Sequence, residues 1–197
     1  DDHLTIRVKQ ESFYSPQVIA VKKMPFIAKG FRGIVSDHCM ILPETMLTRS
    51  PFEITYRLTP GQAYNPFTGI CWLDKANDAW VWLGGNAKDN IITATSYGGG
   101  SIAAVIDKEP AVISVMGVKD TAVYTDPRPK ISFRIHDDLS GVEDDRSFNV
   151  RVNNKWIPVE YDAEKQTGVL LMTDPLPLGE QNLAIIITDK AGHVAER

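Results

Sequence analysis

The side chains best suited to chemistry in this sequence are the carboxylates of HDDLSGVEDDRS, residues 136–147. Another carboxylate, Asp189, stands in the turn-like segment TDKAGHV. Calcium takes six to eight oxygen ligands, many of them carboxylates. If both segments are loops at one end of a β-sandwich, Asp137, Asp138 and Asp189 converge on a single calcium ion. The competing interpretation is that Asp138 and Asp189 cap glycine-containing turns by accepting hydrogen bonds from backbone amides.

A second candidate is the tryptophan-rich segment WLDKANDAWVW, residues 72–82. Side chains two positions apart point to the same face of a β-strand, so Trp80 and Trp82 share a face. An exposed pair of this kind forms a stacking platform for a sugar ring. A buried pair forms one wall of a hydrophobic core, and the sequence leaves both alternatives open.

The three consecutive glycines of YGGGSIAAVID, Gly98 to Gly100, raise the question of phosphate binding. A phosphate loop leads from a strand into a helix and usually carries a lysine. In this sequence the glycines are followed by an apolar run typical of a strand, and YGGGSIAAVID, residues 97–107, contains no lysine. The glycines therefore predict a tight turn, or a backbone that passes close beside a packed side chain.

No sequence pattern for catalysis is present. The histidines are scattered singly, with no His-x-His or His-Glu-x-x-His spacing, and there is no Gly-x-Ser-x-Gly. We therefore expect no catalytic residue, no enzyme activity, and no cofactor apart from the calcium considered above. Cys39 and Cys71 lie in apolar, strand-like surroundings, which predicts buried thiols, although one disulfide stays open.

Composition is that of a globular protein, with 43% hydrophobic and 23% charged residues among 197. The formal net charge of −4 argues against a nucleic-acid partner, which calls for a clustered basic surface. No apolar run reaches the roughly 18 residues of a membrane-spanning helix, so we expect no membrane insertion. The first residues lack a secretion signal, and we expect further sequence upstream of them.

Short β-branched and aromatic segments bounded by Pro, Gly, Asn or Asp dominate the chain, among them FEITYRL, NIITATS, SIAAVID and KWIPVEY. No stretch combines a helical period with helix caps. This pattern predicts an all-β fold of two tandem β-sandwiches. The segment DKEP, residues 107–110, is the best boundary because its proline resists pairing within a sheet. The predicted domains are residues 1–107 and 108–197.

Two resemblances rest on these segments. WLDKANDAWVWLGGN followed by IITATSYGGGSIAAVID resembles the closing part of GAIN and ZU5-type β-sandwiches. The second half, with DDLSGV early and DKAGH late, is similar to bacterial immunoglobulin-like modules, with His193 in place of the usual asparagine. The tandem resembles the C-terminal accessory region of exported Bacteroidetes-type proteins that carry lysostaphin-like (LytM) peptidase domains.

The resemblance implies a non-catalytic accessory or adhesion module that positions or tethers a neighbouring domain of a larger exported protein. The implied location is extracellular, at the cell surface or in the periplasm, and the implied partners are that domain and a cell-wall or surface glycan or protein. GAIN domains cleave themselves at a place that corresponds to Tyr97–Ser101, where the required histidine is absent, so we expect no self-cleavage. The alternative function is a carbohydrate-binding module that uses Trp80 and Trp82.

Overall fold

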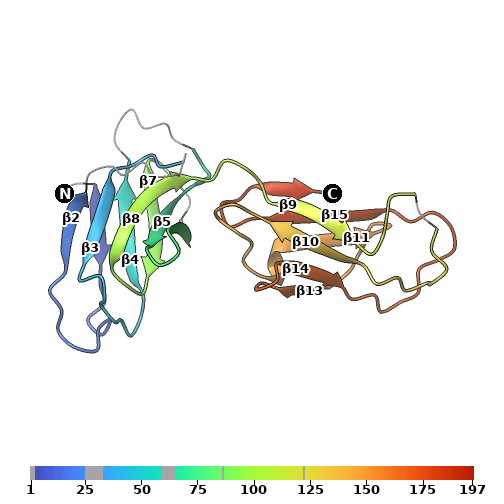
Figure 1. Cartoon of the computed structure of the whole chain (residues 1–197), viewed down its shortest axis with the longest axis horizontal. Coiled ribbons are helices and arrows are strands. Elements are labelled where there is room, and N and C mark those ends of the chain that lie inside the picture. The colour runs from blue at the N-terminus through green and yellow to red at the C-terminus, as the bar shows by residue number, and fades with distance from the viewer. Residues whose placement is uncertain (1–2, 25–32, 59–64, 86, 122) are drawn as a thin grey trace. The chain divides into compact units, whose positions relative to one another are not determined.

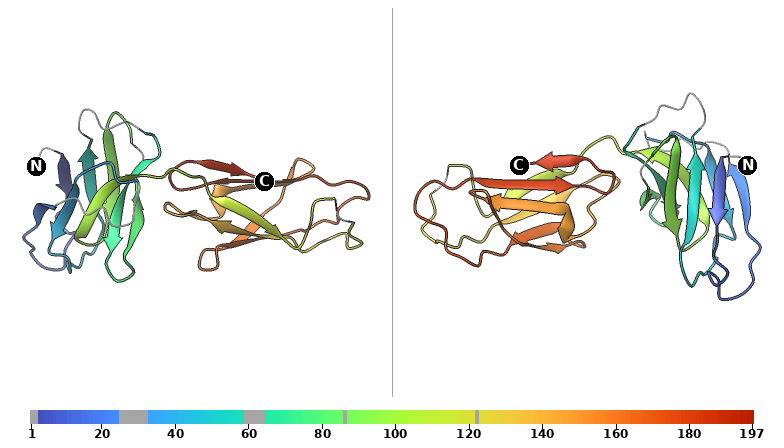
Figure 2. Two further views of the ribbon diagram at one scale, coloured as in Figure 1. Left: turned by 45° about the horizontal axis from the view of Figure 1, so that its top comes forward. Right: turned by 180° about the vertical axis from the view of Figure 1, so that it is seen from behind.

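The computed structural model describes residues 3–24, 33–58, 65–85, 87–121 and 123–197. These residues form sixteen β-strands and one short 3-10 helix, which confirms the predicted all-β, sandwich-type fold. The chain divides into two compact units, Asp1–Lys108 and Glu109–Arg197, and the division falls within DKEP. Figure 1 labels their strands, and Figure 2 shows each unit from two further directions. The described part contains no helix long and apolar enough to cross a membrane.

The first unit contains two antiparallel sheets. Its strands are β1 (Leu4–Arg7), β2 (Ala20–Met24), β3 (His38–Leu42), β4 (Phe52–Arg57), β5 (Thr68–Asp74), β6 (Ala79–Gly84), β7 (Ile91–Ser96) and β8 (Gly100–Ile106). One sheet has the order β1-β4-β7, and the other has the order β2-β3-β8-β5-β6.

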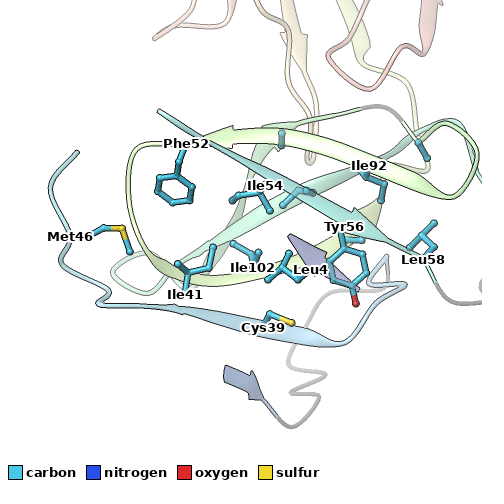
Figure 3. Close-up of a cluster of buried hydrophobic side chains, with 14 residues drawn as sticks. Leu4, Cys39, Ile41, Met46, Phe52, Ile54, Tyr56, Leu58, Ile92 and Ile102 are labelled. Atoms are coloured by element: carbon cyan, nitrogen blue, oxygen red, sulfur yellow. The ribbon is translucent and has the colours of Figure 1, made fainter. Parts of the chain in front are cut away.

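Alternating side chains build the core between these two sheets. On β4, Phe52, Ile54 and Tyr56 are buried, whereas the residues between them are polar and only partly covered. Figure 3 shows these side chains on the side of the core opposite Ile41 and Ile102 of the five-stranded sheet. Full burial of an isoleucine stabilises the fold by about 1.5 to 3 kcal/mol, so this layer holds the sandwich together.

The central strand β8 is buried on both faces, which accounts for the apolar run in SIAAVI. Ile102 and Ala104 join the core between the sheets. Ala103 and Val105 point to the opposite face of the five-stranded sheet, hereafter the outer face, and they are equally buried. A strand covered on both faces needs apolar residues at every position.

The second unit is built from two four-stranded antiparallel sheets. Its elements are β9 (Val112–Met116), β10 (Ser132–His136), the 3-10 helix η1 (Asp145–Ser147), β11 (Phe148–Val152), β12 (Lys155–Trp156), β13 (Val159–Asp162), β14 (Thr167–Leu170), β15 (Leu183–Thr188) and β16 (Val194–Glu196). The strand orders are β13-β14-β10-β9 and β12-β11-β15-β16.

Aromatic rings fill the centre of the second unit. The ring centroid of Phe148 lies 5.7 Å from that of Phe133 and 4.9 Å from that of Tyr161. The Phe133 ring covers Gly168 on the adjacent strand, where an added Cβ would lie 2.4 Å from the ring. Glycine at this position is therefore required by packing.

The predicted single strand KWIPVEY, residues 155–161, is two strands in the structure. Its first part, β12, pairs with β11 in one sheet, and its second part, β13, pairs with β14 in the other. Pro158 lies between them and has no amide hydrogen to donate to a ladder, so the pairing is interrupted there.

Candidate functional site

The glycine triplet forms a corner that is packed against the β3–β4 loop. A Cβ on Gly99 would lie 2.3 Å from the Pro43 carbonyl oxygen and 2.7 Å from that of Ile41. Gly100 has a φ of +121°, and a Cβ there would lie 2.5 Å from Nε1 of Trp72. The glycines therefore allow two backbones to pass in close contact, as the sequence predicts, and the corner leads directly into β8.

Three loops meet at this end of the first unit. An isolated β-bridge joins Phe13 to Thr48, and the Arg49 amide donates a 2.8 Å hydrogen bond to the Ser12 carbonyl. The Thr48 hydroxyl donates to the Tyr97 carbonyl at 2.6 Å. These backbone bonds and the Thr48 side-chain bond connect the β1–β2, β3–β4 and β7–β8 loops, so their exposed side chains form one surface.

A depression of about 340 Å³ opens on this surface, and we call it the loop groove. It is lined by Tyr14, Ser15, Gln17, Pro43, Thr45, Met46 and Leu47. Tyr14 and Leu47 are 66% and 76% exposed, so an aromatic ring and an aliphatic side chain are open to solvent at the groove. Four of the lining residues, Tyr14, Ser15, Gln17 and Thr45, supply hydroxyl or amide groups, and none of the lining side chains is charged.

Contacts around the loop groove fix the side chains that line it. The guanidinium carbon of Arg49 lies 5.1 Å from the centroid of the Tyr14 ring, a cation–π contact. The Gln17 amide donates to the Ser15 hydroxyl at 3.2 Å. Glu44, next to the lining residues, is engaged by Lys75 at 2.5 Å. The groove therefore presents an aromatic ring, contacted by a guanidinium, beside neutral polar groups.

The predicted tryptophan pair does not form two open rings. Trp80 and Trp82 share the outer face, because they pair with Leu73 and Cys71. Trp82 is only 7% exposed, and its ring lies where a Cβ on Gly69 would approach within 2.3 Å. Trp82 is thus an interior residue, and a sugar platform on this strand would rest on the half-buried Trp80 alone.

Trp80 contacts a buried histidine across the same face. Its ring centroid lies 5.6 Å from that of His38, and the planes meet at 70° in an edge-to-face arrangement. His38 is 5% exposed, and its Nε2 has no hydrogen-bond partner in the described part of the chain. Burial lowers the pKa of His38, and the positive charge of Lys75 lowers it further.

The acidic candidates of the second unit lie in two adjacent loops. The Lys190 amide donates a 2.9 Å hydrogen bond to the Gly141 carbonyl, which joins the loop after β10 to the loop after β15. Asp137 Oδ1 accepts hydrogen bonds from the amides of Leu139 at 3.0 Å and Gly141 at 2.6 Å. It is therefore Asp137, and not Asp138, that caps this turn.

Asp189 caps its own loop in the same manner. Its Oδ1 accepts from the amides of Gly192 at 2.8 Å and His193 at 2.9 Å, and its Oδ2 lies 3.1 Å from Nδ1 of His193. Asp138, in contrast, is an exposed residue whose carboxylate lies 2.9 Å from Nε2 of His136. The capping interpretation of the sequence therefore describes the geometry of Asp189.

The three carboxylates do not form a common ligand set in the described residues. The oxygens of Asp137, Asp138 and Asp189 are not all within 4.8 Å of one another. In the neighbouring acidic segment, Asp144 caps η1, and hydrogen bonds from the Arg146 guanidinium and amide hold the pKa of Asp144 below its ordinary value. Calcium binding stays a prediction, which a melting experiment can test.

The two cysteines are free and buried. Cys39 pairs with Ile102 and belongs to the core between the sheets, whereas Cys71 pairs with Ala103 on the outer face. The thiols thus lie on opposite faces of the sheet with β8 between them, too far apart for the 4.4 to 6.8 Å Cα separation of a disulfide. Burial raises the pKa of both thiols, which keeps them protonated.

Comparison with known proteins gives this chain no relative. No protein-family model, no curated protein and no solved structure matches it. The function must therefore be argued from the side chains described above.

Proposed function

We propose that this chain is a non-catalytic accessory and adhesion module of the cell envelope, which positions or tethers a neighbouring domain of a larger exported protein. The observation that carries the proposal is how the reactive side chains are used. Asp137 and Asp189 hold loop amides, and Cys39 and Cys71 lie in the interior. The apolar side chains exposed at the loop end, such as Tyr14, are suited to binding.

We further propose that the first unit is a GAIN/ZU5-like sandwich and the second an immunoglobulin-like sandwich. Support comes from the two-sheet architecture of each unit and from the position of the glycine corner immediately before β8. The corner is occupied by packing-critical glycines, so the chain should remain intact. A single band near 21.9 kDa on a denaturing gel is expected, and two fragments that part near Gly100 would contradict this.

The adhesion function is tested by fusing the full chain to a soluble β-lactamase. The fusion is mixed with washed cells, isolated envelopes and peptidoglycan sacculi from Bacteroidetes, and the sedimented β-lactamase activity is measured. We expect the fusion to sediment with at least one envelope fraction, while β-lactamase alone stays in the supernatant with the same kcat. Partition identical to that of free β-lactamase in every fraction would overturn the proposal, as would sacculus hydrolysis by the chain itself.

A further inference from the structure

We infer that the loop groove of the first unit binds a neutral oligosaccharide, and that Tyr14 is the principal contact. This inference rests on the proposed adhesion function, for which it supplies the ligand class and the site. It moves glycan binding away from Trp80 and Trp82, because Trp82 is interior, to a surface on which large apolar side chains are open to solvent.

The chemistry of the groove lining matches that of a sugar. A pyranose ring presents patches of C–H groups and a rim of hydroxyls, so its binding site needs an aromatic surface beside neutral donors and acceptors. The groove offers the Tyr14 ring and the Leu47 side chain next to the hydroxyls of Ser15 and Thr45 and the amide of Gln17. All five side chains are exposed, and Ser15, Thr45 and Gln17 can form hydrogen bonds with a ligand.

The groove lining is electrically neutral. None of the lining side chains is ionised, and Glu44, which lies between the lining residues Pro43 and Thr45, is paired with Lys75. Arg49, the neighbouring cation, stacks on the Tyr14 ring. Phosphorylated or carboxylated ligands would call for unpaired cations in the lining, so the composition favours an uncharged ligand.

Neighbouring contacts hold the groove lining in place. Arg49 holds the Tyr14 ring, and backbone contacts from Ser12 and Thr48 hold the loops that carry the lining. The glycine corner packs under Pro43, so the floor of the groove is the close-packed end of the sandwich itself. A site that is already ordered loses little conformational entropy when it binds, which favours recognition of a flexible oligosaccharide.

The test titrates the full chain with four defined neutral probes: chitotetraose, cellotetraose, maltotetraose and mannotetraose. Binding is measured by calorimetry and by ligand-observed NMR. We expect saturable binding of at least one probe with a Kd of about 1 mM or tighter. Tyr14→Ala should weaken binding at least about tenfold, because a central aromatic contact is lost, whereas Tyr14→Phe keeps the ring and should stay within about threefold.

Two control variants make the test specific to the groove. Tyr97 is as exposed as Tyr14, at 66%, and belongs to the same loop end, yet it does not line the groove. Tyr97→Ala and Trp80→Ala should each leave Kd within about twofold of wild type. No saturable binding of any probe overturns the inference, as does a Tyr14→Ala variant that binds as tightly as Tyr97→Ala.

The same variants separate this inference from the proposed function. A Tyr14→Ala fusion that sediments with envelopes exactly as wild type does would refute the groove as the attachment site, while adhesion stands. A wild-type chain that binds a tetrasaccharide but does not sediment with any envelope fraction would refute the adhesion function, while the site stands.

Discussion

The glycine corner supplies a sharp test, because three adjacent glycines have different surroundings. A Cβ on Gly98 would meet only the Met46 carbonyl, at 4.0 Å. A Cβ on Gly99 would lie about 0.7 Å inside the 3.0 Å limit of real Cβ contacts, against the Pro43 carbonyl. On Gly100 the added group would meet the Trp72 ring, and the φ of +121° is itself unfavourable for any other residue.

These distances set the expected losses in the free energy of unfolding. Gly98→Ala should change it by no more than about 0.5 kcal/mol, as for a surface substitution. Gly99→Ala should cost about 2 to 3 kcal/mol, the upper part of the range for overpacking, because backbone atoms cannot rotate away. Gly100→Ala should cost about 2 to 4 kcal/mol, because backbone strain adds to displacement of the ring. For a domain of this size, Gly99→Ala lowers Tm by roughly 10 to 20 °C.

The two cysteines provide the assay. Both lie in the first unit and both are buried, so thiol labelling during a urea titration reports unfolding of that unit alone. Fitting the labelled fraction gives the midpoint and the free energy of unfolding for each variant. If Gly98→Ala lowers the free energy of unfolding as much as Gly99→Ala does, the corner requires the backbone flexibility of glycine and not the absence of a Cβ. If Gly99→Ala unfolds at the wild-type midpoint, the close approach to Pro43 is wrong.

Four further predictions concern His38, the two thiols, the loop carboxylates and calcium. Burial lowers the pKa of His38 in the folded protein, so the first unit should lose stability as pH falls from 6.5, the ordinary histidine pKa, toward the lower folded pKa. In urea titrations, His38→Phe should reduce this dependence of the unfolding free energy on pH. An unchanged pH dependence would show that His38 is not its source. Cys39 and Cys71 should resist iodoacetamide in native protein and both react in denaturant, and mass spectrometry that finds either labelled in native protein would refute their burial. Asp189→Ala should destabilise the second unit by about 2 to 3 kcal/mol, and Asp138→Ala by less than about 0.5. If Asp137, Asp138 and Asp189 bind calcium, millimolar calcium should raise Tm, and an unchanged Tm would refute the calcium site and leave the carboxylates as caps of the loop amides.

Strand identity could be predicted from the sequence wherever alternation or continuous apolar runs were strong. FEITYRL matches β4, NIITATS matches β7 and SIAAVID matches β8 to within a residue or two, because a half-buried strand alternates and a doubly covered strand does not. KWIPVEY was predicted less well, since its apolar residues serve two different sheets on either side of Pro158.

Site residues were harder to predict from the sequence, because alternation along a strand and residue composition do not specify which other residues cover a side chain. Parity places Trp80 and Trp82 on one face but is silent on how much of each ring is covered. Likewise, the adjacent acids of DDLSG are equivalent in sequence, and only the turn geometry selects Asp137 as the acceptor for two amides. The alternation between the packed Phe13 and the exposed Tyr14 was a local signal for the groove, but one too short to interpret without its partners.

The loop groove is lined by residues near positions 14 and 45, the β7–β8 loop packs beside them through the Thr48–Tyr97 hydrogen bond, and no local sequence pattern links the three segments. What links them is the glycine corner, which lets the chain leave β7, pass under Pro43 and enter β8 without a side chain in between. The absence of a Cβ at Gly99 is therefore required for the shape of the groove as well as for stability. It follows that Gly99→Ala should weaken oligosaccharide binding and lower Tm together, whereas Tyr14→Ala should lose binding at an unchanged Tm. A Gly99→Ala variant that loses stability but keeps wild-type affinity would show that the groove is independent of the corner, and the argument that joins them would fail.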